Sequence, residues 1–212
     1  MSATYTAGDL RYLRVNGVEA VRRVFVGVRD PGWGTVPAEV VEERVEQRDG
    51  GFSVRFAARH RRDAIDFEWR GSVEARAEGP GAVVRYEMIG RARRPFRTNR
   101  TGVCVLHPVN ECVGRECAVE HPDGTREHRP FPKLISPHPV FREVRRLAYG
   151  AVEVEFEGEV FETEDQRNWS DGSFKTYCRP LDRGFPYELG EGQEIRQAIV
   201  VRVTGGAGTA PL

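Results

Sequence analysis

"LRYLRVNGVEAVRRVFVGV", Leu10 to Val28, holds two runs of strand-forming residues on either side of Asn16-Gly17. Asn-Gly between such runs is a strong signal for a two-residue β-hairpin, because both turn positions need a positive φ. We therefore predict strands over Leu10–Val15 and Val18–Val28, joined by a tight turn.

Alternation of apolar and polar residues continues beyond this hairpin. A period of two places one face of a strand in a core and the other face in water. A second hairpin is expected around Asp49-Gly50-Gly51. The strands predicted after the first hairpin are Val40–Arg48, Phe52–Ala58, Ile65–Arg70, Val83–Met88, Thr101–Leu106, Val152–Glu157 and Ile195–Val203.

The middle of the chain, Arg93–Pro139, is rich in proline and is expected to be loop with short or edge strands. A short helix is predicted over Pro139–Leu147, with Val140, Val144 and Leu147 on one side. Many strands and almost no helical periodicity indicate an all-β fold, an antiparallel β-sandwich with at most one short helix. We expect a single domain over residues 1–204 and a disordered tail over 205–212.

The composition limits the possible functions. Basic and acidic residues are equal at 32 each, so the net charge is zero, and a nucleic-acid partner is not expected. No run of about 18 apolar residues is present, so no membrane span is expected. The N-terminus does not resemble a secretion signal, which favours a cytoplasmic protein.

Four cysteines are present, and in a cytoplasmic chain they are expected to remain thiols. Cys112 and Cys117, with His107 and His121 nearby, form a weak zinc candidate because the usual Cys-x-x-Cys spacing is missing. We therefore predict no metal and no other cofactor.

Three stretches carry a resemblance to a known family. They are "NRTGVCVLHP" (Asn99–Pro108), "FPKLISPHPVF" (Phe131–Phe141) and "ETEDQRNWSDGSFKTYC" (Glu162–Cys178). Together they resemble the N-terminal β domain of the D-apionate lactonase family, and the likeness runs from about Leu10 to Val203. The resemblance implies carbohydrate catabolism by hydrolysis of a sugar-acid lactone. Members of that family carry a barrel-type domain after the β domain, and this sequence ends where that domain would begin.

The polar stretch from Phe161 to Cys178 is the strongest site candidate. If residues 161–169 are extended, Asp165, Arg167 and Trp169 share one face. After a turn at residues 170–172, Lys175 and Tyr177 share a face of the next strand. A hairpin would then bring Asp165, Arg167 or Trp169 close to Lys175 or Tyr177.

Lactone hydrolysis needs a base for water, a donor for the oxyanion and groups that hold the sugar hydroxyls. Asp165 or Glu164 could act as the base, and Arg167 or Lys175 could stabilise the negative charge. The residues predicted to bind substrate are Arg167, Asn168, Trp169 and Tyr177.

Two residues outside this stretch complete the candidates. His107, with Glu111 shortly after it, could supply a general base and an orienting carboxylate, or it could be a loop histidine at the rim of the sheet. Arg100 could bind a carboxylate, or it could pair with a surface glutamate.

Three interpretations remain open. The chain is an active lactonase-like enzyme or the β portion of one, acting on a small sugar acid or lactone. Alternatively, it is a non-catalytic β-sandwich that binds sugar or docks a barrel-type catalytic domain, or a mutarotase- or epimerase-like sugar enzyme. The polar stretch could also be a solvated hairpin with surface ion pairs, each worth about 0–1 kcal/mol.

Overall fold

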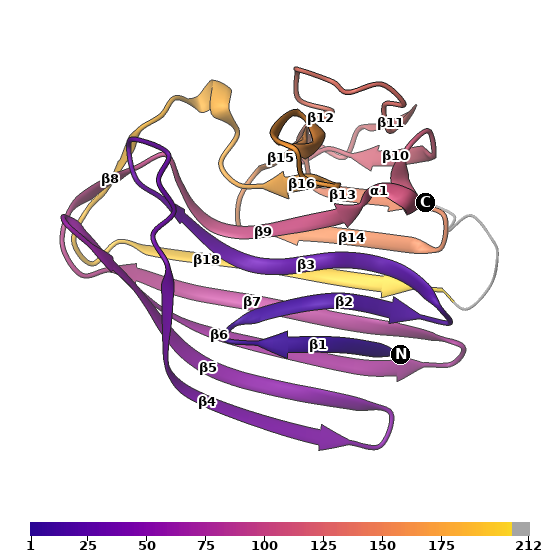
Figure 1. Ribbon diagram of the computed structural model, residues 1–212, viewed down its shortest axis with the longest axis horizontal. Coiled ribbons are helices and arrows are strands. Elements are labelled where there is room, and N and C mark those ends of the chain that lie inside the picture. Colours follow the sequence, from indigo (N-terminus) through magenta and orange to yellow (C-terminus); the bar gives the residue numbers. More distant parts are fainter. Residues whose placement is uncertain (205–212) are drawn as a thin grey trace.

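The structure is a computed structural model that describes residues 1–204 and consists almost entirely of antiparallel strands (Figure 1). One sheet has seven strands, in the spatial order β1 (Ser2–Thr6), β2 (Asp9–Val15), β3 (Val18–Arg29), β9 (Arg100–Pro108), β16 (Ser173–Tyr177), β15 (Phe161–Asp165) and β12 (Phe141–Val144).

The second sheet has nine strands. Its spatial order is β11 (Arg126–Pro130), β10 (Glu116–Glu120), β13 (Arg146–Tyr149), β14 (Val152–Glu157), β18 (Glu194–Val203), β7 (Gly81–Ala92), β6 (Ile65–Glu78), β5 (Gly51–Arg62) and β4 (Ala38–Arg48). A small ribbon pairs β17 (Tyr187–Leu189) with β8 (Phe96–Thr98). The helical elements are α1 (Val109–Cys112) and the 3₁₀ turns η1 (Gln166–Trp169) and η2 (Leu181–Arg183).

The two large sheets pack face to face, as Figure 1 shows for β2, β3 and β9 lying over β6, β7 and β18. The apolar side chains of each strand alternate into the shared core, as the period of two predicts. Two hydrogen bonds also connect the sheets. The Tyr86 hydroxyl donates to Gly8 O at 2.7 Å, and Val103 N donates to Gln197 Oε1 at 2.8 Å. The all-β sandwich predicted from the sequence is therefore confirmed.

The first hairpin forms as predicted. Asn16 and Gly17 both have positive φ, 52° and 83°, as a tight two-residue turn between strands requires. Strands β2 and β3 continue one residue beyond the predicted segments, at Asp9 and Arg29. The predicted tail, residues 205–212, lies outside the described residues.

The helix predicted over Pro139–Leu147 is wrong. This segment forms β12 and β13, which belong to different sheets. Phe141, Val144 and Leu147 are all fully buried, but their three-residue spacing has another cause. Glu143 has a φ of 48°, and the register against β15 shifts between Phe141 and Val144. A bulge therefore imitates helical spacing in an extended chain.

None of the helices within residues 1–204 has the length and apolar composition needed to span a lipid bilayer.

Candidate functional site

A cluster of buried polar side chains lies on the face of the seven-stranded sheet that is turned away from the core. On β16, Phe174 and Thr176 point into the core, so Lys175 and Tyr177 point to the opposite, outer face. On β15, Glu164 lies directly across from Lys175, and Glu162 across from Tyr177. We call this set the outer-face cluster: Arg100, Glu162, Glu164, Gln166, Lys175 and Tyr177.

Lys175 is held by two side chains. Its Nζ lies 3.0 Å from Glu164 Oε1 and donates to Gln166 Oε1 at 3.0 Å. Gln166 Nε2 in turn donates to Glu164 Oε1 at 2.8 Å. Burial and the nearby Arg100 charge lower the pKa of Lys175, and Glu164 only partly opposes this shift. The ammonium is therefore easier to deprotonate than an exposed lysine.

Glu162 is a buried carboxylate that the sequence analysis did not select. Its Oε1 accepts from the Tyr177 hydroxyl at 2.9 Å and from Leu181 N at 3.4 Å, and its Oε2 lies 3.5 Å from Arg142. Burial, with the charges of Glu164 and Glu162 adding to it, raises the pKa of Tyr177 far above its usual value. Glu162 and Glu164 are two residues apart on β15, and this alternation places both on one face.

Arg100 is the least satisfied member of the cluster. Its side chain is only 5% exposed, and its guanidinium lies 3.4 Å over the Tyr177 ring. The nearest carboxylate oxygen, Glu164 Oε1, is 3.8 Å away, too far for a hydrogen bond. The Nε atom is buried without a partner.

Two exposed aromatic rings pack together, and one of them lies beside Arg100. Trp33 and Phe185 are 38% and 47% exposed, and their ring centroids are 5.1 Å apart. Trp33 also lies 5.6 Å from the Arg100 guanidinium. Its φ of 67° is costly for a bulky residue and is held by the turn in which Asp30 accepts from Gly34 N at 2.7 Å. Neither aromatic residue was selected from the sequence.

The predicted meeting of Asp165, Arg167 and Trp169 with Lys175 and Tyr177 is wrong. Strand β15 ends at Asp165, whose carboxylate accepts from Arg167 N at 3.1 Å and so caps the 3₁₀ turn η1. Residues after Asp165 therefore do not continue the strand alternation. Asp165 itself points inward, away from Lys175.

Asp165 and Arg167 form a structural pair that holds a neighbouring loop. Burial would raise the pKa of Asp165, but its hydrogen bonds to Arg167 and Ser136 N outweigh burial, and the pKa lies below its usual value. Arg167 also donates to Pro132 O (2.9 Å), and Asn168 donates to Ser136 O and to Asp165 O. These two predicted substrate-binding residues thus fix the backbone of residues 132–136.

The tied segments present three exposed apolar side chains. Trp169 is 77% exposed, Leu134 85% and Ile135 55%. We call them the apolar patch. The aromatic ring beside the Arg100 guanidinium is that of Trp33.

His107 is a core residue. It is completely buried, its Nδ1 lies 2.9 Å from the Tyr149 hydroxyl, and its Nε2 lies 2.8 Å from Thr176 Oγ1. Burial lowers its pKa to about 3, so the ring is neutral at ordinary pH. Neither hydrogen bond involves Glu111, which favours a structural role for His107 over that of a general base.

The cysteines are buried thiols. Burial raises the pKa of Cys117 to about 12, and that of Cys112 rises in the same direction. His121 directs its Nδ1 to Glu143 O rather than to a sulfur. Within residues 1–204, no three potential ligands gather in a metal-binding arrangement.

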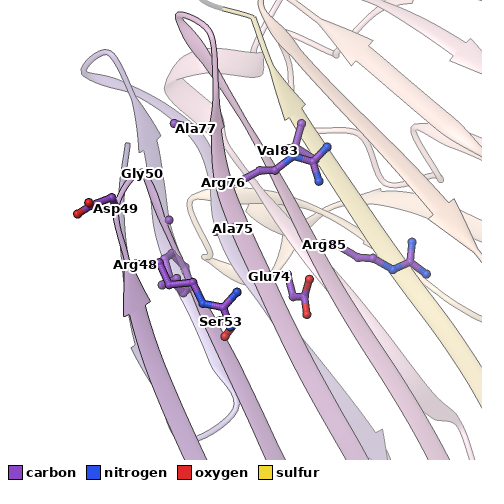
Figure 2. A pocket seen from close by; sticks show the side chains of 12 residues that line it. Arg48, Asp49, Gly50, Ser53, Glu74, Ala75, Arg76, Ala77, Val83 and Arg85 are labelled. Atoms are coloured by element: carbon purple, nitrogen blue, oxygen red, sulfur yellow. The ribbon is translucent and has the colours of Figure 1, made fainter.

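The outer face of the nine-stranded sheet is also polar, but its charged side chains form ion pairs with one another. A shallow hollow near the β4–β5 turn is lined by Arg48, Glu74, Arg76 and Arg85 (Figure 2). Arg85 is paired with Glu157 at 2.9 Å. This face matches the solvated sheet surface that the mixed charge predicts.

The outer-face cluster and the neighbouring Trp33 combine a carboxylate, two basic groups and an aromatic ring. Glu164 can accept a proton, Lys175 and Arg100 can stabilise negative charge, and Trp33 offers a flat apolar surface. Fold and cluster together define an antiparallel β-sandwich with a polar site on one sheet face.

In its fold, the chain is similar to a galactose mutarotase-like protein from Lactobacillus casei, with a TM-score of 0.55 and 13% identity, over 95% of this chain and 96% of that one. The family model of the D-apionate lactonase N-terminal domain matches residues 1–206, and the chain belongs to that family. A D-apionate lactonase from Brucella anthropi is 36% identical over 210 residues. That match covers 96% of this chain and 34% of the relative, so the chain spans about a third of the relative's length.

Proposed function

We propose that this chain is the β-sandwich portion of a sugar-acid lactone hydrolase, with the outer-face cluster as its substrate site. Family membership supports the reaction class. The single observation that supports the site is the contact of Glu164 with the buried Lys175, beside Arg100, whose buried Nε has no hydrogen-bond partner within residues 1–204.

In this proposal Glu164 takes a proton from water, and the resulting hydroxide attacks the lactone carbonyl. Arg100 and Lys175 stabilise the oxyanion that forms on the carbonyl oxygen. The ring C–O bond then breaks, protonated Glu164 gives its proton to the leaving oxygen to form a hydroxyl, and the new acid releases one proton to solvent. Trp33 packs on the apolar face of the sugar.

Proton release from a panel of aldono-1,4-lactones tests this proposal. Glu164→Gln should lower kcat/KM by roughly 100-fold or more, the usual scale for removal of a general base. Glu87→Gln, on the outer face of the nine-stranded sheet, is the matched control and should keep the wild-type rate. Hydrolysis by wild type that Glu164→Gln leaves unchanged would remove Glu164 from the mechanism.

A second function, docking of a further domain, is favoured by the apolar patch. Arg167, paired with the buried Asp165, donates to the backbone carbonyls of Pro132 and Leu134 and so ties down the loop that carries Leu134 and Ile135. Exposed apolar groups that lie together are typical of a contact surface. We infer that a barrel-type domain is the partner in a longer family member. Trp169→Ser should weaken binding of a separately produced barrel domain by at least about tenfold, the scale of an interface hot spot. Equal binding by both forms would exclude the patch.

The compartment is also inferred. Four buried thiols without a disulfide suit a reducing compartment such as the cytoplasm. A mutarotase-like activity is not proposed, because His107, the histidine selected from the sequence, is enclosed by core hydrogen bonds to Tyr149 and Thr176.

A further inference from the structure

The positive charges in the outer-face cluster exceed the carboxylates available to them. Arg100 and Lys175 both approach the same oxygen, Glu164 Oε1, at 3.8 and 3.0 Å. Glu162 does not help them, because its oxygens are taken by Tyr177, Leu181 N and Arg142. Two buried cations therefore share one carboxylate.

Arg100 in particular lacks the partners that a buried guanidinium requires. An arginine side chain carries five N–H donors in a planar fork, and leaving such donors unsatisfied away from water is unfavourable. Within residues 1–204, no protein oxygen accepts a hydrogen bond from the Arg100 side chain, and its Nε is enclosed. The ring of Tyr177 supports the cation from one side only.

The side chains on the solvent side of the Arg100 guanidinium are aromatic and partly exposed. Trp33 lies 5.6 Å from the guanidinium and packs edge to face against Phe185, and both rings remain exposed. The φ of 67° at Trp33 shows that the turn holds this side chain in place at a conformational cost. An exposed aromatic ring beside an unsatisfied cation fits a ligand with an anionic end and an apolar carbon face.

We propose that Arg100 and Lys175 form a receptor for the carboxylate of an open-chain hydroxy acid, whose carbon chain lies against Trp33. A planar guanidinium matches a carboxylate with two parallel hydrogen bonds, and the Lys175 ammonium adds a third donor. This inference rests on the proposed function, because opening a lactone produces such an acid. The site would then hold the product, and the free acid would inhibit hydrolysis.

The test compares an acid with the alcohol that differs from it only at the charged carbon. Isothermal titration would use D-xylonate and D-gluconate against xylitol and D-glucitol. The acids should bind, and the alditols should bind at least roughly tenfold more weakly, which corresponds to one strong charge-assisted contact. Equal binding of acid and alditol, or no binding of either acid, would overturn the proposal.

Single substitutions identify the residues that bind the carboxylate. Arg100→Gln should weaken acid binding at least roughly tenfold and leave the weak alditol binding unchanged, whereas Arg100→Lys, which keeps the charge but not the fork, should fall between. Arg196→Gln removes an exposed arginine paired with Glu87 on the other sheet and is the matched control. If Arg100→Gln does not fold, Lys175→Met provides the same comparison. Acid binding within twofold of wild type in a folded variant would remove that residue from the receptor.

Inorganic phosphate and acetate separate a hydroxy-acid site from a general anion site. Both should bind more weakly than the aldonates, since neither has a carbon chain for Trp33, and equal binding would overturn the proposal. Lactone hydrolysis is measured on the same samples. Hydrolysis without acid binding would reject the receptor and keep the proposed function, whereas acid binding without hydrolysis would reject the catalytic proposal and keep the receptor.

Discussion

Acid should destabilise this protein through His107, and the size of the effect follows from its surroundings. The ring is neutral in the fold because burial lowers its pKa to about 3. In the unfolded chain a histidine has a pKa of about 6.5. The unfolded state therefore binds a proton that the folded state does not, and stability falls as pH decreases from about 6.5 towards 3.

The loss of stability is already measurable in mildly acidic solution. At about pH 5 the unfolded histidine lies about 1.5 pH units below its pKa, which at 1.36 kcal/mol per unit removes about 2 kcal/mol of stability relative to neutral pH. Urea unfolding of wild type and of His107→Gln at the two pH values measures this difference. The buried His60 and the paired carboxylates contribute to both proteins alike, so the comparison isolates His107.

In wild type, the loss of unfolding free energy on acidification should exceed that in His107→Gln by about 2 kcal/mol. The matched control, His128→Gln, replaces an exposed histidine on β11 and should follow wild type. Identical pH dependence in wild type and His107→Gln would show that His107 can be protonated in the folded state, and would reopen a catalytic role for it.

Two further predictions concern the other sequence candidates. Asp165→Asn leaves Arg167 without its carboxylate partner and should cost about 3 kcal/mol of unfolding free energy in urea, whereas Glu46→Gln in an exposed pair should cost much less. Equal losses would show that the Asp165–Arg167 pair is not structural. The thiols should not react with a disulfide reagent at mildly alkaline pH until the protein is unfolded, since all four are buried: Cys104, Cys112, Cys117 and Cys178. Fast reaction of the native protein would contradict this burial.

The strands could be predicted because their signals are local. Asn16-Gly17 specifies its own turn, and alternation along β5, β6, β7 and β14 marks which side chains enter the core. The failure over Pro139–Leu147 has an equally local cause. The bulge at Glu143 changes the period of a strand, and a single sequence does not distinguish such a bulge from a helical turn.

The site could be predicted only in part. The stretch from Phe161 to Cys178 does carry Glu164 and Lys175, which meet across strands as a hairpin allows. The strand expected over residues 161–169 stops at Asp165, because the Asp165 side chain caps η1, and alternation does not reveal such a competition between a side chain and strand pairing. Trp33 and Arg100 come from distant segments, so their approach depends on tertiary packing alone.

The central claim is that the outer-face cluster binds the sugar-acid ligand. An amide NMR titration of the ¹⁵N-labelled chain with D-xylonate tests it most directly, because the shifts locate the ligand without any substitution. We predict shifts concentrated at Trp33, Arg100, Glu164 and Lys175, and unchanged signals on β4 to β7. Shifts confined to the apolar patch or to the nine-stranded sheet would contradict it.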